Sequence, residues 1–391
     1  MNKKPKNPNV LTIKESRAII KSNLAEMKRL EKKKREQKTV DQYTSVMRSN
    51  DNIVEIDGLE TCFFTDNGVV RSVNKISFDI PKNSVVGLVG ESGCGKSVTS
   101  LSIMQLVQAP QGQVIGGEIR FNSDELGVND KGEKVCYDIT KMPTLDMCRI
   151  RGKDISMIFQ EPMTSLNPVF TVGYQIEEVF YLNNPEATKE EARQKAIDMI
   201  SLVGIPMPET IVDYYPHQLS GGMRQRIMIA IALTGNPKLI IADEPTTALD
   251  VTIQSQILRL LQKVQKDCGA SILLITHDLG VVAEVADYVV VMYAGKIVEK
   301  GTVYEIFDNP MHPYTIGIQK AKPSLASDSG TELYSIPGNV PNPINIPDEC
   351  LFKGRCNRKC GKCTGAYPKE IKITDTHSVF CYLYDEEKED N

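Results

Sequence analysis

The middle of the chain alternates short apolar runs with longer polar stretches of helical character. Four short, largely apolar runs, at residues 85–89, 156–159, 239–242 and 272–275, are predicted to form buried strands. A helical stretch follows the first of them from Ser97. Unbroken apolar strands that alternate with helices are typical of a mostly parallel sheet covered by helices. The pattern therefore predicts an α/β fold.

A helix-rich insert separates the second and third of these strands. Thr188 and Glu191 have the spacing of a capping box, and the Glu-, Ala-, Arg- and Lys-rich segment after them predicts a helix to about Leu202. We expect the residues from about 161 to 236 to form a helical subdomain.

The first 50 residues form a basic segment. They carry 14 Lys and Arg against 5 Asp and Glu, whereas the whole chain has a formal net charge of −4. Thr12 and Glu15 again have capping-box spacing. Apolar residues then recur at helical spacing: Ile13, Ile20, Leu24, Met27 and Leu30. The segment is predicted to be an amphipathic helix or a solvated, flexible arm, and contact with anionic lipid or a membrane subunit is the alternative.

The regular pattern fades after Gly301, and composition then changes. Prolines accumulate, and five of the ten cysteines lie between residues 350 and 381. We therefore expect three units: the arm at 1–50, a core at 51–305 and a C-terminal extension at 306–391.

Composition and hydropathy exclude some classes of protein. Apolar runs such as 288–292 are far shorter than the roughly 18 residues of a membrane-spanning helix. The N-terminus lacks the apolar segment of a secretory signal, so we expect a cytosolic protein. Because disulfides are rare in a reducing compartment, the clustered cysteines indicate metal binding first.

The sharpest motif is GESGCGKS at residues 90–97, directly after the first predicted strand. Its glycines let backbone N–H groups turn toward phosphate oxygens, and the helix after it presents its positive end. Lys96 is expected to neutralise the β and γ phosphates, and Ser97 to bind Mg²⁺ through its hydroxyl.

A second acidic element follows the predicted strand at 239–242. Asp243 lies at the carboxyl end of this strand, where open α/β sheets bind ligands, and Glu244 comes next. Alone, such a pair is more often a solvated helix cap. Together with the phosphate loop it indicates that Asp243 reaches Mg²⁺ through water and that Glu244 polarises the water that attacks phosphorus.

The segment LSGGMRQR at residues 219–226 lies between these two motifs. With it, the chain resembles the nucleotide-binding subunits of ABC transporters. The resemblance implies a P-loop NTPase core with a mostly parallel sheet, an antiparallel β subdomain and an α-helical signature subdomain. It also implies that Ser220, Gly221 and Gly222 bind the γ-phosphate of ATP held by a partner subunit, so that the chain must dimerise to work.

The same resemblance assigns smaller motifs along the chain. Gln160 matches the glutamine loop that senses Mg²⁺ and faces a membrane subunit, Asp250 the loop at the dimer interface, and His277 the switch histidine. Glu244, His277 and Gln160 are the implied catalytic residues. The implied ATP-binding residues are Phe64 (or its neighbour Phe63) for adenine, Gly90, Glu91, Ser92, Gly93, Cys94, Gly95, Lys96, Ser97, Val98, Ser220, Gly221, Gly222 and Asp250, and Mg²⁺ would be held by Ser97, Gln160 and Asp243.

The resemblance narrows to the ATPases of oligopeptide, dipeptide and nickel importers over about residues 53–383. GESGCGKS, EPMTSLNP and HQLSGGMRQR fit that subfamily, and IFDNPMHPYT at 306–315 is its typical entry into a C-terminal extension. It implies an ATPase that drives import, with peptide favoured over nickel because peptide systems are the more numerous branch.

The implied partners are a second ATPase chain, usually non-identical, two transmembrane permease subunits and an extracytoplasmic substrate-binding protein. The chain would then lie at the cytoplasmic face of the membrane. Two other classes stay open: a soluble ABC-type ATPase acting on nucleic acid, although no nucleic acid is expected in an acidic body, and a metal-sensing regulator.

The cysteine cluster has two interpretations. By spacing alone, Cys360 and Cys363 resemble half of a zinc site that Cys356, Cys381 or His377 would complete. The subfamily pattern instead implies a [4Fe-4S] cluster, and its ligands would be Cys350, Cys356, Cys363 and Cys381. Cys360 departs from that pattern and leaves zinc, or no metal, open.

Overall fold

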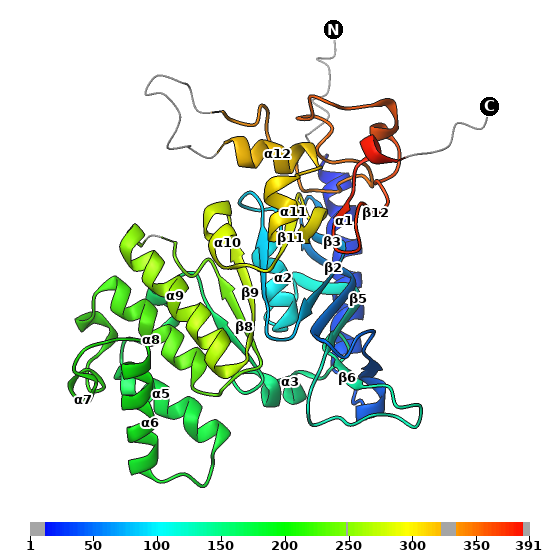
Figure 1. Ribbon diagram of the computed structural model, residues 1–391. Coiled ribbons are helices and arrows are strands. Elements are labelled where there is room, and N and C mark those ends of the chain that lie inside the picture. Colours follow the sequence, from blue (N-terminus) through cyan, green and yellow to red (C-terminus); the bar gives the residue numbers. More distant parts are fainter. Residues whose placement is uncertain (1–11, 248, 322–333, 386–391) are drawn as a thin grey trace, which may run out of the picture.

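Two sheets that differ in strand direction organise this computed structural model, which describes residues 12–247, 249–321 and 334–385 (Figure 1). The larger sheet has eight strands, in the spatial order β12 (Ile371–Lys372), β13 (Ser378–Val379), β11 (Lys296–Thr302), β10 (Tyr288–Tyr293), β4 (Val85–Val89), β9 (Ser271–Thr276), β8 (Leu239–Asp243) and β7 (Ile155–Ile158). From β10 to β7 all neighbours are parallel, whereas β11, β13 and β12 pair antiparallel.

The smaller sheet is antiparallel and is dominated by a long hairpin of two 14-residue strands. Its spatial order is β1 (Thr44–Val46), β6 (Val135–Asp138), β5 (Gly112–Phe121), β2 (Asn52–Thr65) and β3 (Gly68–Pro81).

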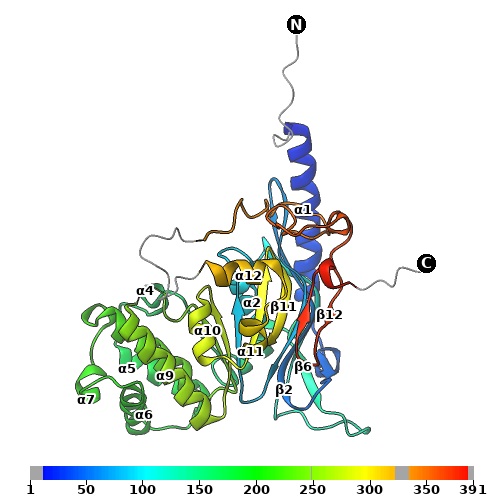
Figure 2. The ribbon, with the colours of Figure 1, turned by 45° about the horizontal axis from the view of Figure 1, so that its top comes forward.

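Helices surround both sheets. They are α1 (Ile13–Lys34), α2 (Lys96–Ile103), α3 (Thr144–Ile150), α4 (Pro162–Ser165), α5 (Val172–Asn183), α6 (Lys189–Leu202), α7 (Pro208–Ile211), α8 (Gly221–Leu233), α9 (Val251–Cys268), α10 (Leu279–Val285), α11 (Val303–Asp308) and α12 (Pro313–Lys320). Single 3-10 turns occur at Val40–Gln42, Pro216–Gln218, Gly361–Thr364 and Tyr382–Tyr384. Helices α5 to α8 gather on one side, away from the antiparallel sheet (Figures 1 and 2).

The parallel strands are apolar throughout because the sheet separates two hydrophobic cores. In β4, Val85 and Val89 pack into the core with the helical insert, whereas Val86 and Leu88 pack into the core with the antiparallel sheet. Successive side chains of a strand point to opposite faces, so a strand buried on both faces needs an unbroken apolar run. The mostly parallel sheet expected from these runs is confirmed.

The predicted strands differ from the observed ones only at their ends. The run expected at 156–159 begins one residue earlier, because Ile155 pairs with Leu239 of β8, and it ends before Phe159, which is 37% exposed. The capping box of Thr188 and Glu191 is confirmed, and α6 ends at Leu202 as expected.

The N-terminal segment forms a helix that packs on the antiparallel sheet. The capping box of Thr12 and Glu15 is confirmed. The predicted apolar face is only partly correct: Leu30 is buried, but Ile13 is 74% exposed and Leu24 is 48% exposed. Asn23 is buried instead, and its amide donates a hydrogen bond to the carbonyl of Thr65 in β2 at 2.8 Å. A polar residue with a satisfied amide thus replaces an apolar one on this face.

The C-terminal extension attaches to both sheets. β13 pairs with β11, and the Nε2 atom of buried His377 lies 2.8 Å from Oε1 of buried Glu299. On the other sheet, the backbone N–H of Asn345 donates to the carbonyl of Val69 at 2.9 Å, and its side-chain oxygen accepts from the N–H of Val69 at 3.1 Å. The boundaries expected near residues 50 and 305 stay predictions.

Glu305 of α11 also ties the extension to the core. Its carboxylate accepts hydrogen bonds from the hydroxyls of Thr374 and Thr376 at 2.6 and 2.9 Å, and from Thr302 in the helix cap. Burial alone would raise the pKa of Glu305, but these hydrogen bonds outweigh it and hold the pKa at about 2. The side chain is therefore ionised at neutral pH.

The α-helices of the described residues range from four residues in α4 to 22 in α1. Across residues 12–247, 249–321 and 334–385, none combines the length and the apolar character that spanning a membrane demands.

Candidate active site

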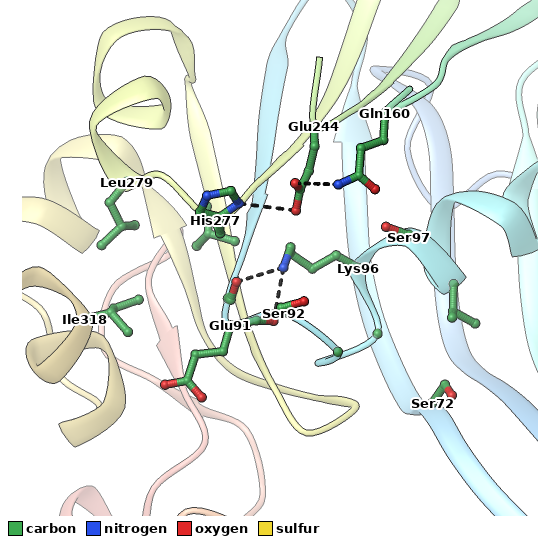
Figure 3. A pocket seen from close by; sticks show the side chains of 15 residues that line it. Ser72, Glu91, Ser92, Lys96, Ser97, Gln160, Glu244, His277, Leu279 and Ile318 are labelled. Atoms are coloured by element: carbon green, nitrogen blue, oxygen red, sulfur yellow. Dashed lines mark hydrogen bonds and ion pairs between the residues drawn. The ribbon is translucent and has the colours of Figure 1, made fainter. Parts of the chain in front are cut away.

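Four loops meet at the carboxyl edge of the parallel strands and line a cavity of about 630 Å³ (Figure 3). The loops follow β4, β7, β8 and β9. Because these strands are parallel, their carboxyl ends lie at the same edge of the sheet. The lining residues are Ser72, Val89, Gly90, Glu91, Ser92, Gly93, Gly95, Lys96, Ser97, Val98, Gln160, Glu244, His277, Leu279 and Ile318.

The phosphate loop needs glycine where it passes close to neighbouring backbone. Gly95 has a φ of 106°, and a Cβ atom there would lie 2.1 Å from the carbonyl oxygen of Ser72. At Gly90 a Cβ atom would lie 2.2 Å from the carbonyl oxygen of Met292. Any other side chain would therefore clash with these strands.

Lys96 is the cation of the cavity and is itself buried, with 4% of its surface exposed. Its Nζ atom donates hydrogen bonds to the carbonyl oxygens of Gly90 at 2.8 Å and Glu91 at 3.1 Å. These contacts hold the ammonium group inside the loop at the first turn of α2. The arrangement places a positive charge where the loop would enclose phosphate oxygens.

Ser97 and Asp243 are brought together as the sequence predicts. The Ser97 hydroxyl donates to Oδ1 of Asp243 at 3.0 Å, and the Ser100 hydroxyl lies 3.4 Å from Oδ2. Burial raises the pKa of Asp243, and the neighbouring Glu244 charge acts in the same direction, whereas the bond from Ser97 opposes it. A hydroxyl and a carboxylate oxygen this close fit the oxygen ligands that Mg²⁺ prefers.

Three loops converge on the carboxylate of Glu244 (Figure 3). The Gln160 amide donates to Oε2 at 3.0 Å, the Thr247 hydroxyl donates to Oε2 at 2.9 Å, and Nδ1 of His277 lies 3.3 Å from Oε1. Glu244 also has a φ of 46°, which is uncommon outside glycine and is found where surrounding contacts enforce it. The structure thus joins the three predicted catalytic side chains, whose roles stay predictions.

The signature segment lies outside this cavity. Ser220 caps α8, and its hydroxyl oxygen accepts a hydrogen bond from the N–H of Met223 at 3.3 Å. Gly221 and Gly222 begin the helix, and Ser220 and Gly221 are exposed. Asp250 similarly caps α9 by accepting from the N–H of Ile253 at 3.0 Å and is also exposed. None of these four predicted residues lines the cavity of its own chain.

Comparison with known proteins identifies the family. The sequence-family model described as ABC transporter matches residues 73–247. A second family model, described as oligopeptide/dipeptide transporter, C-terminal region, matches residues 298–363. The oligopeptide transport ATP-binding protein AppD of Bacillus subtilis is 48% identical over 335 residues, which cover 86% of this chain and 98% of that protein. The chain belongs to the ABC transporter family.

Other ABC transporter proteins support the same assignment. The dipeptide transport ATP-binding protein DppD of Escherichia coli is 43% identical, with 84% of this chain and 96% of that protein covered. The structure of cbiO1 from Clostridium perfringens is 26% identical and has a TM-score of 0.52, with 66% of this chain and 92% of that chain covered. The structure of the cassette MJ0796, in a dimeric post-hydrolysis state bound to ADP and Pi, is 24% identical and has a TM-score of 0.54. The match covers 64% of this chain and 98% of that chain. The predicted ABC ATPase cassette fold is therefore confirmed.

Phe64 does not line the phosphate cavity of this ABC protein. It is 9% exposed and lines a separate cavity of about 400 Å³. Its neighbours there are Glu26, Cys62, Val69, Arg71, Ile115, Asn345 and Ile346. Phe63 is half-buried and lies over Gly112 of β5, where a Cβ atom would approach its ring to 2.8 Å. Adenine stacking on either ring stays a prediction.

Sequence reasoning missed four residues of the phosphate cavity, of which Val89 was predicted only as part of a strand. Ser72, Leu279 and Ile318 lie on β3, α10 and α12, and they carry no motif. It also missed the hydrogen bond from the Thr247 hydroxyl to the Glu244 carboxylate. The short separation of three residues between them was the signal that could have indicated it.

The C-terminal cysteines of the ABC protein lie near one another. Burial, together with nearby Cys363 and Cys356, raises the pKa of the Cys350 thiol to about 11. Burial likewise raises the pKa of Cys381 to about 12, with Cys350, Cys356 and Cys363 adding to the effect. The Sγ atoms of Cys360 and Cys363 are 3.4 Å apart. Five thiols thus share one region of the extension.

These thiols do not form a single-ion site. In the ranges that the structure describes, no group of three or more His, Cys, Asp and Glu side chains is arranged to hold a metal ion. His377, the possible zinc ligand, pairs with Glu299 instead. Among the described residues, neither the iron–sulfur prediction nor its zinc alternative is thus supported by a preformed site.

Proposed function

We propose that this chain is the ATP-hydrolysing subunit of an importer that takes up oligopeptides or dipeptides across the cytoplasmic membrane. The names of its relatives and the C-terminal match at residues 298–363 support the peptide class. The observation that carries the proposal is a single cavity lined by Lys96, by Ser97 and by the Glu244 group. Asp243 binds the Ser97 hydroxyl at the edge of this cavity. We assign β1, β6, β5, β2 and β3 to the antiparallel subdomain, and α4 to α8 to the helical signature subdomain.

The chemistry follows from what each side chain can do. Lys96 would move its ammonium group from the loop carbonyls to the β and γ phosphates of ATP. Ser97 and Asp243 would hold Mg²⁺, which neutralises phosphate charge when bound. Glu244 would accept a proton from the attacking water, and Gln160 and His277 would keep the carboxylate and the water oriented toward the γ-phosphorus.

We infer that the working unit is a dimer with two sandwiched nucleotides. The exposed N-terminus of α8, with Ser220, Gly221 and Gly222, is free of the chain's own phosphate cavity and can present N–H groups to an anion. A second ATPase chain, identical or more usually non-identical, would bring its own signature segment to Lys96. Asp250, exposed at the cap of α9, would lie at that interface.

Attachment to permease subunits is supported by apolar residues after Gln160. Met163 is 64% exposed, Val169 69%, and Phe170 and Tyr174 42% and 49%. Exposed apolar side chains grouped in one segment are typical of a protein interface. We propose that this segment binds one of two transmembrane permease subunits at the cytoplasmic face of the membrane, and that an extracytoplasmic protein delivers the peptide.

The peptide assignment is tested by transport. The tagged chain would be purified from solubilised native membranes and the complex reconstituted in proteoliposomes with its substrate-binding protein outside and ATP inside. We expect ATP-dependent accumulation of a radiolabelled tripeptide or dipeptide, abolished when Glu244 is replaced by glutamine. Accumulation of nickel without peptide would favour the nickel branch. Salt-sensitive retention of RNA or DNA without permeases would contradict the importer.

We also propose that Cys350, Cys356, Cys363 and Cys381 hold a [4Fe-4S] cluster, with zinc as the alternative. The mutual electrostatic effects of these thiols support their proximity. Ligands of a cluster bind different irons, so the thiols need not converge on one point as zinc ligands do.

Anaerobic purification followed by metal analysis and visible absorption tests this site. We expect about four irons per chain with charge-transfer absorption, lost in Cys363→Ser and kept in Cys268→Ser, whose thiol is exposed on α9. One zinc per chain would select the alternative, and metal-free protein would contradict both.

A further inference from the structure

Two residues of the C-terminal extension form hydrogen bonds with Glu91, the second residue of the phosphate loop, from outside the nucleotide cavity. Glu91 lines the cavity, and its carboxylate Oε2 accepts a hydrogen bond from Nη1 of Arg355 at 2.8 Å. The backbone N–H of Glu91 donates to the hydroxyl of Tyr314 at 2.8 Å. Both partners lie more than 220 positions away in the chain, on segments that follow the nucleotide motifs described above.

Arg355 is itself fixed in place. Its Nε donates to the carbonyl of Pro337 at 3.1 Å and its Nη2 to that of Ile336 at 3.2 Å. The guanidinium lies 5.8 Å from the ring centre of Tyr293, and 8% of the side chain is exposed. A planar fork with this many partners binds a carboxylate in a defined direction.

Tyr314 is equally constrained. It is fully buried, and its ring centre lies 4.8 Å from that of Tyr293 and 5.5 Å from that of Phe352. Aromatic contacts of this kind fix the ring and therefore the position of the hydroxyl. The acceptor for the N–H of Glu91 thus belongs to a rigid cluster rather than to a mobile side chain.

The inner contact on Glu91 is different in kind. Lys96 binds the carbonyl of Glu91 at 3.1 Å, but the same ammonium group must turn to phosphate when ATP binds. The contacts with Arg355 and Tyr314 would then remain, together with the hydrogen bond from the N–H of Cys94 to the carbonyl of Glu91 at 3.2 Å, and only Arg355 and Tyr314 contact the carboxylate and the N–H of this residue. In addition, an unpaired carboxylate beside a triphosphate would repel it, and the Arg355 charge offsets that repulsion.

We propose that Arg355 and Tyr314 are positioning residues for ATP: they hold Glu91, neutralise its charge and so keep the phosphate loop ready to bind nucleotide. The C-terminal extension is then part of the nucleotide site. The inference rests on the proposed ATPase function and extends it, because it assigns a share of ATP affinity to a segment outside the nucleotide motifs.

Arg355→Ala is the first test, made in the full-length chain. We expect the Kd for a fluorescent ATP analogue and the KM for ATP to rise about fivefold to tenfold, as for the loss of a partly exposed charged hydrogen bond, with kcat changed less than about twofold. Lys359→Ala is the matched control, since it removes one exposed positive charge four residues away. Wild-type affinity in folded Arg355→Ala would overturn the proposal.

Glu91→Gln separates charge neutralisation from mere packing. Without the carboxylate there is no repulsion to offset, so we expect Glu91→Gln to make ATP binding less sensitive to the loss of Arg355. Combined with Arg355→Ala, it should recover at least about half of the lost binding free energy. No recovery in the double variant would contradict the proposed role of the Arg355 charge.

Tyr314→Phe covers the case in which Arg355→Ala does not fold. Removing one hydroxyl should raise the Kd for ATP about threefold while the melting temperature in the absence of nucleotide stays close to that of the wild type. An unchanged Kd in Tyr314→Phe would count against the positioning role. Failure of the wild-type chain to bind ATP would instead refute the proposed function, so the two failures are distinguishable.

Discussion

Glu244→Gln is expected to lower the rate of ATP hydrolysis by at least about 10²-fold, in keeping with the loss of a general base. The carboxylate receives hydrogen bonds from Gln160 and Thr247 and lies 3.3 Å from His277, so it is held in the wall of the cavity with limited freedom. Glutamine keeps the volume but cannot accept a proton from water. Binding of ATP should remain, because Lys96 and the phosphate loop are intact.

The measurement is phosphate release at saturating ATP, together with a titration of a fluorescent ATP analogue. Glu190→Gln, which removes one exposed carboxylate from α6, is the control. Near-normal hydrolysis by Glu244→Gln would remove Glu244 from the proposed catalytic role and leave the rest of the cavity to be reassigned.

Lys96→Ala is expected to weaken ATP binding by about 10²-fold or more. The ammonium group is buried at the centre of the phosphate loop, and two charge-assisted contacts with phosphate oxygens are worth about this factor. The substitution also leaves the carbonyls of Gly90 and Glu91 without their donor, so the empty loop loses support as well.

Titration with a fluorescent ATP analogue measures this loss, and thermal unfolding without nucleotide shows whether the loop alone was damaged. Lys263→Ala, exposed on α9, is the control for the loss of one positive charge. Wild-type affinity in Lys96→Ala would place the nucleotide elsewhere and would undermine the whole assignment of the cavity.

Local sequence patterns predicted the strands and the phosphate loop well. A strand buried on both faces has no solvent-exposed position that favours a polar residue. The strands β4, β8 and β9 were therefore recognisable in the sequence as largely continuous apolar runs. The glycines at 90 and 95 were equally visible, because each position excludes a Cβ atom by contact with a neighbouring strand. Both signals lie within a few residues of the feature they predict.

Patterns were weaker where a long-range contact decides. The face of α1 was only partly predicted, because the buried Asn23 depends on an acceptor in β2. The family resemblance implied that Phe64 stacks on adenine, which stays a prediction, but it gave no sign that the path of β2 places this ring in a cavity separate from the phosphate loop. Neither the burial of Asn23 nor the position of Phe64 can be predicted from the residues next to it in the sequence.

The sequence by itself determined the α/β fold, the family, the order of the nucleotide motifs and the residue types that can bind phosphate and Mg²⁺. Tertiary structure alone decided which distant residues join them: the fork of Arg355 and the hydroxyl of Tyr314 on Glu91, and Ser72 and Ile318 in the cavity wall. The physical reason is that strand burial and backbone sterics act over neighbouring residues and leave a periodic or glycine pattern. A single contact between segments hundreds of residues apart has no such pattern, because it depends on how both sheets and the extension pack together.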